Sequence, residues 1–145
     1  AGVYASRGAS ALVFRGAYTG LDELTAADLN QVWIVADGNV TPTEFDARSA
    51  LGMAACTIDD LAGGEAQDNA AVARDVLAGA GPQPVRDAVA LNAAAGILAW
   101  EGLDAPVTPR DFVDRMRDAV ERARSGLRAG AGAALIERWK KASAK

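Results

Sequence analysis

The residue pair best suited to chemistry is Asp22 with Glu23, in the stretch GAYTGLDELT. These adjacent carboxylates closely follow a short apolar run over residues 11–16. Ligands in α/β sheets gather at the carboxyl ends of strands. Two carboxylates there can share a Mg2+, directly or through waters, because Mg2+ takes hard oxygen ligands. The alternative is a solvated helix start, where the helix dipole favours both acids, and the pair by itself favours this alternative.

Three neighbours of the pair bear on the choice. Gly16 and Gly20 would let the backbone approach a ligand closely, since glycine has no Cβ. Arg15 lies at the end of the same predicted strand. Its guanidinium is suited to facing a phosphate, and equally to pairing with Asp22 or another surface acid.

Other polar residues favour structural roles. Asp59 and Asp60 are expected in a solvated first turn. Arg86, Asp87 and Asn92 belong to a predicted helix, where packing and capping are favoured over chemistry. The glycine-rich stretches match neither GxGxxG nor GxxxxGK[ST], so the sequence predicts no phosphate-cradling loop of those kinds.

Composition excludes several classes of function. The 145 residues contain no histidine and one cysteine, Cys56, which excludes a Ser-His-Asp triad, a histidine metal site and an intrachain disulfide. The net charge of −4 lacks the basic footprint of a nucleic-acid partner. The only basic cluster in the sequence is Lys140, Lys141 and Lys145, whose positive charges are expected to complement the negative C-terminal end of a helix dipole. The apolar stretches are too short to cross a bilayer and no signal peptide begins the chain, so a cytoplasmic location is expected.

The elements around the acids can be predicted from hydrophobic patterning. The consecutive apolar residues of the 11–16 run indicate a strand covered on both faces. Residues 32–35 predict a second strand, Asp37-Gly38 a type I′ turn, and residues 40–45 the returning strand. Pro42 cannot donate a ladder hydrogen bond, which makes the returning strand an edge.

Helices dominate the remainder. The patterns predict one over residues 66–78 and one over residues 85–100 that is apolar nearly all round and therefore central. Asn92, the only polar side chain between residues 88 and 100, must find hydrogen-bond partners there. Thr108 is the predicted N-cap of the next helix. A last helix over residues 133–142 is expected to pack through three apolar side chains, Leu135, Ile136 and Trp139.

Three ordered stretches resemble a known family. VFRGAYTGLDELT, DLAGGEAQDNAAVARDVLAG and VRDAVALNAAAGILAWEGL are similar, in this order and spacing, to the C-terminal portion of the anthranilate phosphoribosyltransferases. Each stretch is a modest signal and their ordered combination is specific. The resemblance covers residues 1 to about 103 and is looser beyond them.

The resemblance implies a fold and a reaction. The fold would be α/β, part of the nucleoside phosphorylase/phosphoribosyltransferase-like domain, with a central sheet, a β-hairpin and packed helices. The family's homodimeric enzymes move phosphoribose from phosphoribosyl pyrophosphate to anthranilate in tryptophan biosynthesis. Their Asp-Glu pair holds one of two Mg2+ ions on the pyrophosphate, a role that carries over to Asp22 and Glu23. No nucleic acid or membrane partner is implied.

The same resemblance implies that residues 1–145 are the C-terminal part of the α/β domain, without the helical domain and phosphate loop that lie upstream in the family. The isolated chain is then expected to be inactive, and the 11–16 strand to have an unpaired edge. Two departures stand out: Arg15-Gly16 replaces the family's usual His-Gly, and residues 17–19 differ from its short acidic stretch. A pyrimidine-nucleoside phosphorylase-like enzyme and a non-catalytic domain of the same fold remain alternatives.

Overall fold

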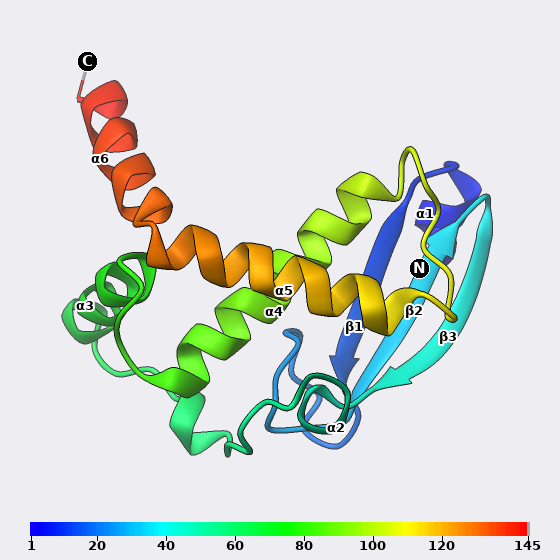
Figure 1. Ribbon diagram of the computed structural model, residues 1–145, viewed down its shortest axis with the longest axis horizontal. Coiled ribbons are helices and arrows are strands. Elements are labelled where there is room, and N and C mark those ends of the chain that lie inside the picture. Colours follow the sequence, from blue (N-terminus) through cyan, green and yellow to red (C-terminus); the bar gives the residue numbers. More distant parts are fainter. Residues whose placement is uncertain (145) are drawn as a thin grey trace.

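A computed structural model describes residues 1–144 (Figure 1). A short helix, α1, precedes a three-stranded sheet, and helices make up nearly all of the regular structure after it. The helices are α1 (Gly2–Ser6), α2 (Ala47–Leu51), the 3-10 turn η1 (Asp59–Leu61), α3 (Ala66–Leu77), α4 (Gln83–Glu101), α5 (Phe112–Arg128) and α6 (Ala131–Ser143). The strands are β1 (Ala11–Gly16), β2 (Asn30–Ala36) and β3 (Asn39–Phe45).

The sheet is antiparallel, with β2 between β1 and β3. Asp37 and Gly38 both have positive φ, 50° and 73°, which confirms the type I′ turn of the predicted hairpin. Pro42 lies on β3, an edge strand, as expected. Within residues 1–144, β1 pairs with β2 alone, so its other edge has no strand partner, which was also predicted.

The core lies between one face of the sheet and the helices α4 and α5 (Figure 1). Alternation along β2 directs Val32 and Ile34 into this core. The central position predicted for α4 is confirmed on one face, where Ala90, Leu91 and Leu98 are fully buried, whereas Trp100 on the same helix is 75% exposed. The apolar stripe of α5 contributes further core residues, Phe112, Met116, Ala119 and Val120, and the ring of Phe112 meets that of Phe45 edge to face, 5.4 Å between centroids.

Two expectations about burial were wrong for the described residues. The apolar residues of β1 are only half-buried: Leu12 and Phe14 pack against the core beneath α4, and Val13, which alternates to the opposite face, is also partly exposed. Helix α6 projects away from the rest of the molecule (Figure 1), and Leu135 and Trp139 are 56% and 70% exposed instead of packed. Lys145 of the terminal basic cluster lies outside the described residues.

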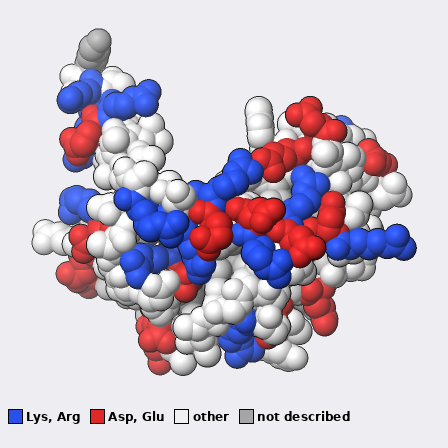
Figure 2. All heavy atoms as spheres, in the orientation of Figure 1, with Lys and Arg blue, Asp and Glu red and all other residues white. Residues whose placement is uncertain are grey.

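Charged side chains of both signs follow α5 across the surface in Figure 2. Most are matched within a turn or across to a neighbouring helix, as in Arg117 with Asp114 at 2.6 Å and Arg124 with Glu121 at 2.9 Å. Exposed pairs of this kind contribute little stability. No helix in residues 1–144 is long and apolar enough to cross a membrane.

Candidate functional site

The candidate site is the loop of residues 17–29, which joins β1 to β2 and carries the acidic pair. Asp22 and Glu23 are both exposed and lie in a bend rather than a helix, so the helix-start interpretation is wrong. Neither carboxylate takes part in a hydrogen bond or ion pair recorded within residues 1–144. The loop lies at the same end of the sheet as α2 (Figure 1).

The first half of the loop is organised by a buried carboxylate, Asp28. It is 5% exposed, and its Oδ2 accepts hydrogen bonds from the Tyr18 N–H (3.0 Å), the Thr19 N–H (2.8 Å) and the Thr19 hydroxyl (2.8 Å). Burial by itself would raise the pKa of Asp28. The bonds from Thr19, Tyr18 and the Leu29 backbone outweigh burial, so the pKa lies below its ordinary value.

Gly16 lies directly against the side chains of Thr19 and Asp28. A Cβ on Gly16 would meet the Thr19 hydroxyl and would lie 2.7 Å from Oδ2 of Asp28. In this structure Gly16 approaches the chain's own side chains closely, and its approach to a ligand stays a prediction. Gly20 has a φ of +72°, with open space around it, and supplies the left-handed turn residue before the acids.

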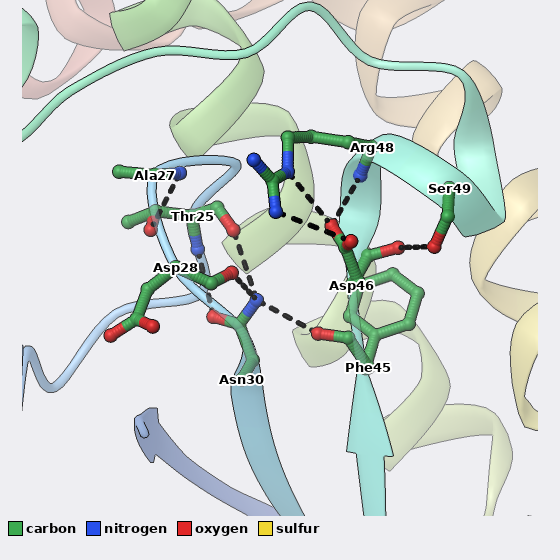
Figure 3. A network of polar contacts seen from close by, with 8 residues as sticks. All are labelled: Thr25, Ala27, Asp28, Asn30, Phe45, Asp46, Arg48 and Ser49. Atoms are coloured by element: carbon green, nitrogen blue, oxygen red, sulfur yellow. Dashed lines mark hydrogen bonds and ion pairs between the residues drawn. The ribbon is translucent and has the colours of Figure 1, made fainter. Parts of the chain in front are cut away.

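The second half of the loop is organised by Asn30, which is completely buried (Figure 3). Its Oδ1 accepts from the Thr25 N–H at 3.1 Å, and its Nδ2 donates to Thr25 O, Asp28 O and Phe45 O at 2.9, 3.1 and 3.0 Å. Asn30 thus ties the loop to the end of β3. Sequence patterning gave no sign of this role, because Asn30 stands at a loop–strand boundary where polar residues are usual.

Beyond β3, Asp46 caps α2 (Figure 3). Its Oδ1 accepts from the Arg48 N–H at 3.0 Å and from Arg48 Nε at 3.1 Å. The bonds from Arg48 hold the pKa of Asp46 below its ordinary value against the opposing effect of burial. The network seen in Figure 3 therefore fixes the backbone on both sides of the β3 end.

The side-chain amide of Asn92 has the hydrogen-bond partners that were predicted for it. Its Oδ1 accepts from the Leu24 N–H at 3.1 Å, and its Nδ2 donates to Leu24 O at 3.0 Å and to Ala88 O at 2.8 Å. Leu24, which directly follows the acidic pair, is 1% exposed. The other two helix residues considered from sequence have structural partners: Asp87 pairs with Arg124 at 2.8 Å and Arg86 donates to Gly79 O at 3.0 Å.

The exposed acids can hold a hard cation only with outside help. Among residues 1–144, no group of three or more histidine, cysteine, aspartate or glutamate side chains is placed to hold a metal. Mg2+ is usually bound by one or two carboxylates together with waters and substrate phosphates. Asp22 and Glu23, exposed on a tightly held loop, fit that donor set. Arg15 is exposed and forms none of the ion pairs recorded in the described chain, with Asp22 or any other acid.

Comparison with known proteins places this fold and loop in a family. Residues 2–133 match the family described as "Glycosyl transferase family, a/b domain". The chain belongs to this family. An anthranilate phosphoribosyltransferase of Arthrobacter sp. (strain FB24) is 50% identical over 139 residues, which cover 96% of the chain and 38% of that relative, and one of Rhodococcus opacus (strain B4) is also 50% identical, with 96% and 36% covered. The chain thus spans well under half the length of these relatives.

Solved structures confirm the α/β fold of the family. The anthranilate phosphoribosyltransferase of Thermus thermophilus has a TM-score of 0.71 and 32% identity, covering 91% of the chain and 35% of that protein. The Saccharomyces cerevisiae enzyme in complex with PRPP and Mg has a TM-score of 0.70 at 17% identity, covering 88% and 33%, a likeness of fold alone. The resemblance expected from the three sequence stretches is confirmed.

Proposed function

We propose that residues 1–145 are the C-terminal part of the α/β domain of an anthranilate phosphoribosyltransferase, with the helical domain and phosphate loop in the remainder of the protein. The whole protein would move phosphoribose from phosphoribosyl pyrophosphate to anthranilate, in tryptophan biosynthesis. The observation that carries the proposal is the exposed Asp22–Glu23 pair, fixed by a hydrogen-bonded loop in a chain half identical to relatives of that name. That naming favours transfer to anthranilate over the phosphorylase alternative.

Within this function, the chain would supply one metal-binding position. Asp22 and Glu23 would hold Mg2+, which stabilises the negative charge that develops on departing pyrophosphate. The chain's own contribution is to present two carboxylates at a fixed place, with no ion pair to either of them recorded in the described residues. Asp28 and Asn30 hold the loop on either side, so little reorganisation is needed when the pyrophosphate arrives.

The test of this proposal removes the two charges in the full-length protein. The variant Asp22→Asn with Glu23→Gln should raise the Mg2+ concentration for half-maximal turnover by about tenfold or more, since it removes direct or water-mediated ligands, while thermal stability changes little. A matched control, Asp104→Asn with Glu65→Gln, removes two exposed charges away from the 17–29 loop. Unchanged Mg2+ dependence in the first variant would refute the metal assignment.

The isolated 145-residue chain provides a second test. It should turn over no anthranilate, because the phosphate loop and the acceptor pocket are proposed to lie in the rest of the protein. The measurement is a fluorescence assay of anthranilate consumption with phosphoribosyl pyrophosphate and Mg2+ in excess. Turnover by the chain alone would contradict the proposed division of the active site.

A further inference from the structure

The main chain immediately after the acidic pair is held by two asparagines from different elements. Asn92 of α4 accepts from the N–H of Leu24 and donates to its C=O, at 3.1 and 3.0 Å. Asn30 of β2 does the same to Thr25, at 3.1 and 2.9 Å. Both backbone groups of two consecutive residues are therefore satisfied by side-chain amides, in the way that neighbouring strands satisfy a strand within a sheet.

Asn92 is the more informative of the two because its position is costly. It lies on a helix that is otherwise apolar from residue 88 to residue 100, where an unpaired amide would be unfavourable. Its three hydrogen bonds offset that cost, and two of them reach across 68 positions of sequence to Leu24. A helix needs no such residue for its own stability, so the amide acts on the loop.

The backbone of Leu24 is joined directly to Glu23. Fixing Leu24 N fixes the peptide plane that carries the Glu23 carbonyl, and so restricts the directions in which Asp22 and Glu23 can extend. Leu24 itself is buried in the core, which prevents the loop from sliding along α4. Without Asn92, the Leu24 N–H and C=O would lack partners and the loop would have to move to reach water.

We propose that Asn92 is a positioning residue for the metal-binding pair: its amide holds Leu24 so that Asp22 and Glu23 meet Mg2+ and pyrophosphate in one arrangement. The inference rests on the proposed function, since it requires that the two carboxylates bind a metal. Residues that orient metal ligands without touching the metal typically change affinity by about 10- to 100-fold when replaced. The loss expected for Asn92→Leu is about tenfold, because Asn30 still holds the adjacent residue.

The chain offers a matched control in Asn69 of α3. Its side chain makes the same two-way contact with the backbone of one loop residue, Gly64, at 2.9 Å for both bonds. Asn69→Leu thus removes the same kind of interaction from a loop without the acidic pair. A general loss of loop order would affect both variants in the same way, whereas positioning of the metal ligands would affect only Asn92→Leu.

The experiment measures Mn2+ affinity by electron paramagnetic resonance, with inorganic pyrophosphate present, in the full-length protein. Asn92→Leu should bind Mn2+ about tenfold more weakly than the wild type and Asn69→Leu equally well, with hydrogen exchange at the Leu24 amide faster only in the former. Wild-type affinity in Asn92→Leu, together with loss of binding in the Asp22→Asn, Glu23→Gln variant, would overturn the role of Asn92 alone. Wild-type affinity in the carboxylate variant would overturn the proposed metal assignment itself, and with it the role of Asn92.

A second substitution covers the case in which Asn92→Leu does not fold. Asn92→Asp keeps an oxygen to accept from the Leu24 N–H but replaces the donor that faces Leu24 O and Ala88 O. It should weaken Mn2+ binding in the same direction, because an oxygen now opposes two carbonyls. Undiminished Mn2+ affinity in Asn92→Asp would also overturn the positioning role.

Discussion

Replacing Asp28 by asparagine separates the charge of this buried group from its hydrogen bonds. All three recorded bonds from Tyr18 and Thr19 converge on one oxygen, Oδ2. An asparagine with its carbonyl oxygen at the same place can accept all three, but as a neutral acceptor. The variant therefore tests what the ionised form contributes to the loop, with the shape of the side chain nearly unchanged.

The expected loss can be worked from these contacts. Hydrogen bonds to charged groups contribute about 1.5–3 kcal/mol and neutral ones about 0.5–1.5 kcal/mol. Three bonds would thus lose about 3 kcal/mol if they were independent. Because they share one acceptor oxygen, we expect about 2 kcal/mol in the free energy of unfolding at pH 7. Asp28→Ala, which removes the acceptor entirely, should cost more, about 3–4 kcal/mol, since two loop N–H groups lose their partner.

The pH dependence provides the sharper assay. The folded pKa of Asp28 is depressed, so its stabilisation is fully present above the unfolded pKa of about 3.9 and is lost as pH falls through the folded pKa. Urea unfolding curves of wild type and Asp28→Asn should therefore differ at pH 7 and converge progressively below about pH 4. Asp22→Asn, at an exposed carboxylate in the same loop, should shift the curves by less than about 0.5 kcal/mol. A wild-type advantage over Asp28→Asn that persists unchanged to pH 2 would refute the reasoning.

Three further variants test the elements that hold the site. Gly16→Ala should destabilise by about 1–3 kcal/mol in thermal unfolding, because its Cβ meets Thr19 and the Asp28 carboxylate; a neutral substitution would contradict the packing of the turn. Asn30→Leu should cost at least about 3 kcal/mol, since four bonds are lost inside the core, and a loss under about 1 kcal/mol would be inconsistent with that network. Asp87→Asn should lower the free energy of unfolding in urea by about 2 kcal/mol, because it weakens the largely buried ion pair with Arg124. The same loss in 1 M salt would agree with a buried pair, whereas a loss that disappears in 1 M salt would indicate a surface pair.

The strands and most helices could be predicted because they depend on local patterns. The Asp37-Gly38 turn allows one hairpin geometry, and the apolar run before it fixes the strand that enters the turn. The 85–100 helix was recognisable because a sequence apolar nearly all round is typical of a central helix. The structure buries one face of this helix and leaves Trp100 exposed. The N-cap predicted at Thr108 was wrong: α5 begins at Phe112 with Asp111 as its N-cap, although Thr108 and Asp111 bond reciprocally in the turn before it.

Burial at the margins could not be predicted, because it depends on which surfaces meet. The apolar residues of β1 and α6 carry the same pattern as core residues, and local periodicity says only that a face is apolar. Whether that face is covered is a property of the neighbouring elements, and within residues 1–144 Trp139 is left 70% exposed and the apolar residues of β1 are only half-buried. Such residues are consistent with a proposal in which this chain is one portion of a larger domain.

The acidic loop shows a different limit. From sequence, Asp22 and Glu23 could be recognised as candidate metal ligands. Asp28 and Asn30, which determine the loop's shape, could not be distinguished from ordinary polar residues of a loop. A half-buried amide on an apolar helix, such as Asn92, indicates that it needs a partner, yet the partner is a backbone group, and residue identity does not reveal which backbone group that is. The carboxylates are exposed and each side chain is unbonded within the described chain, so the function proposed for them depends on the polar groups that hold the loop. In the proposed metal site, the residues that position the acidic pair are therefore those whose hydrogen bonds end on main-chain atoms, and substitutions there should separate positioning from direct metal contact.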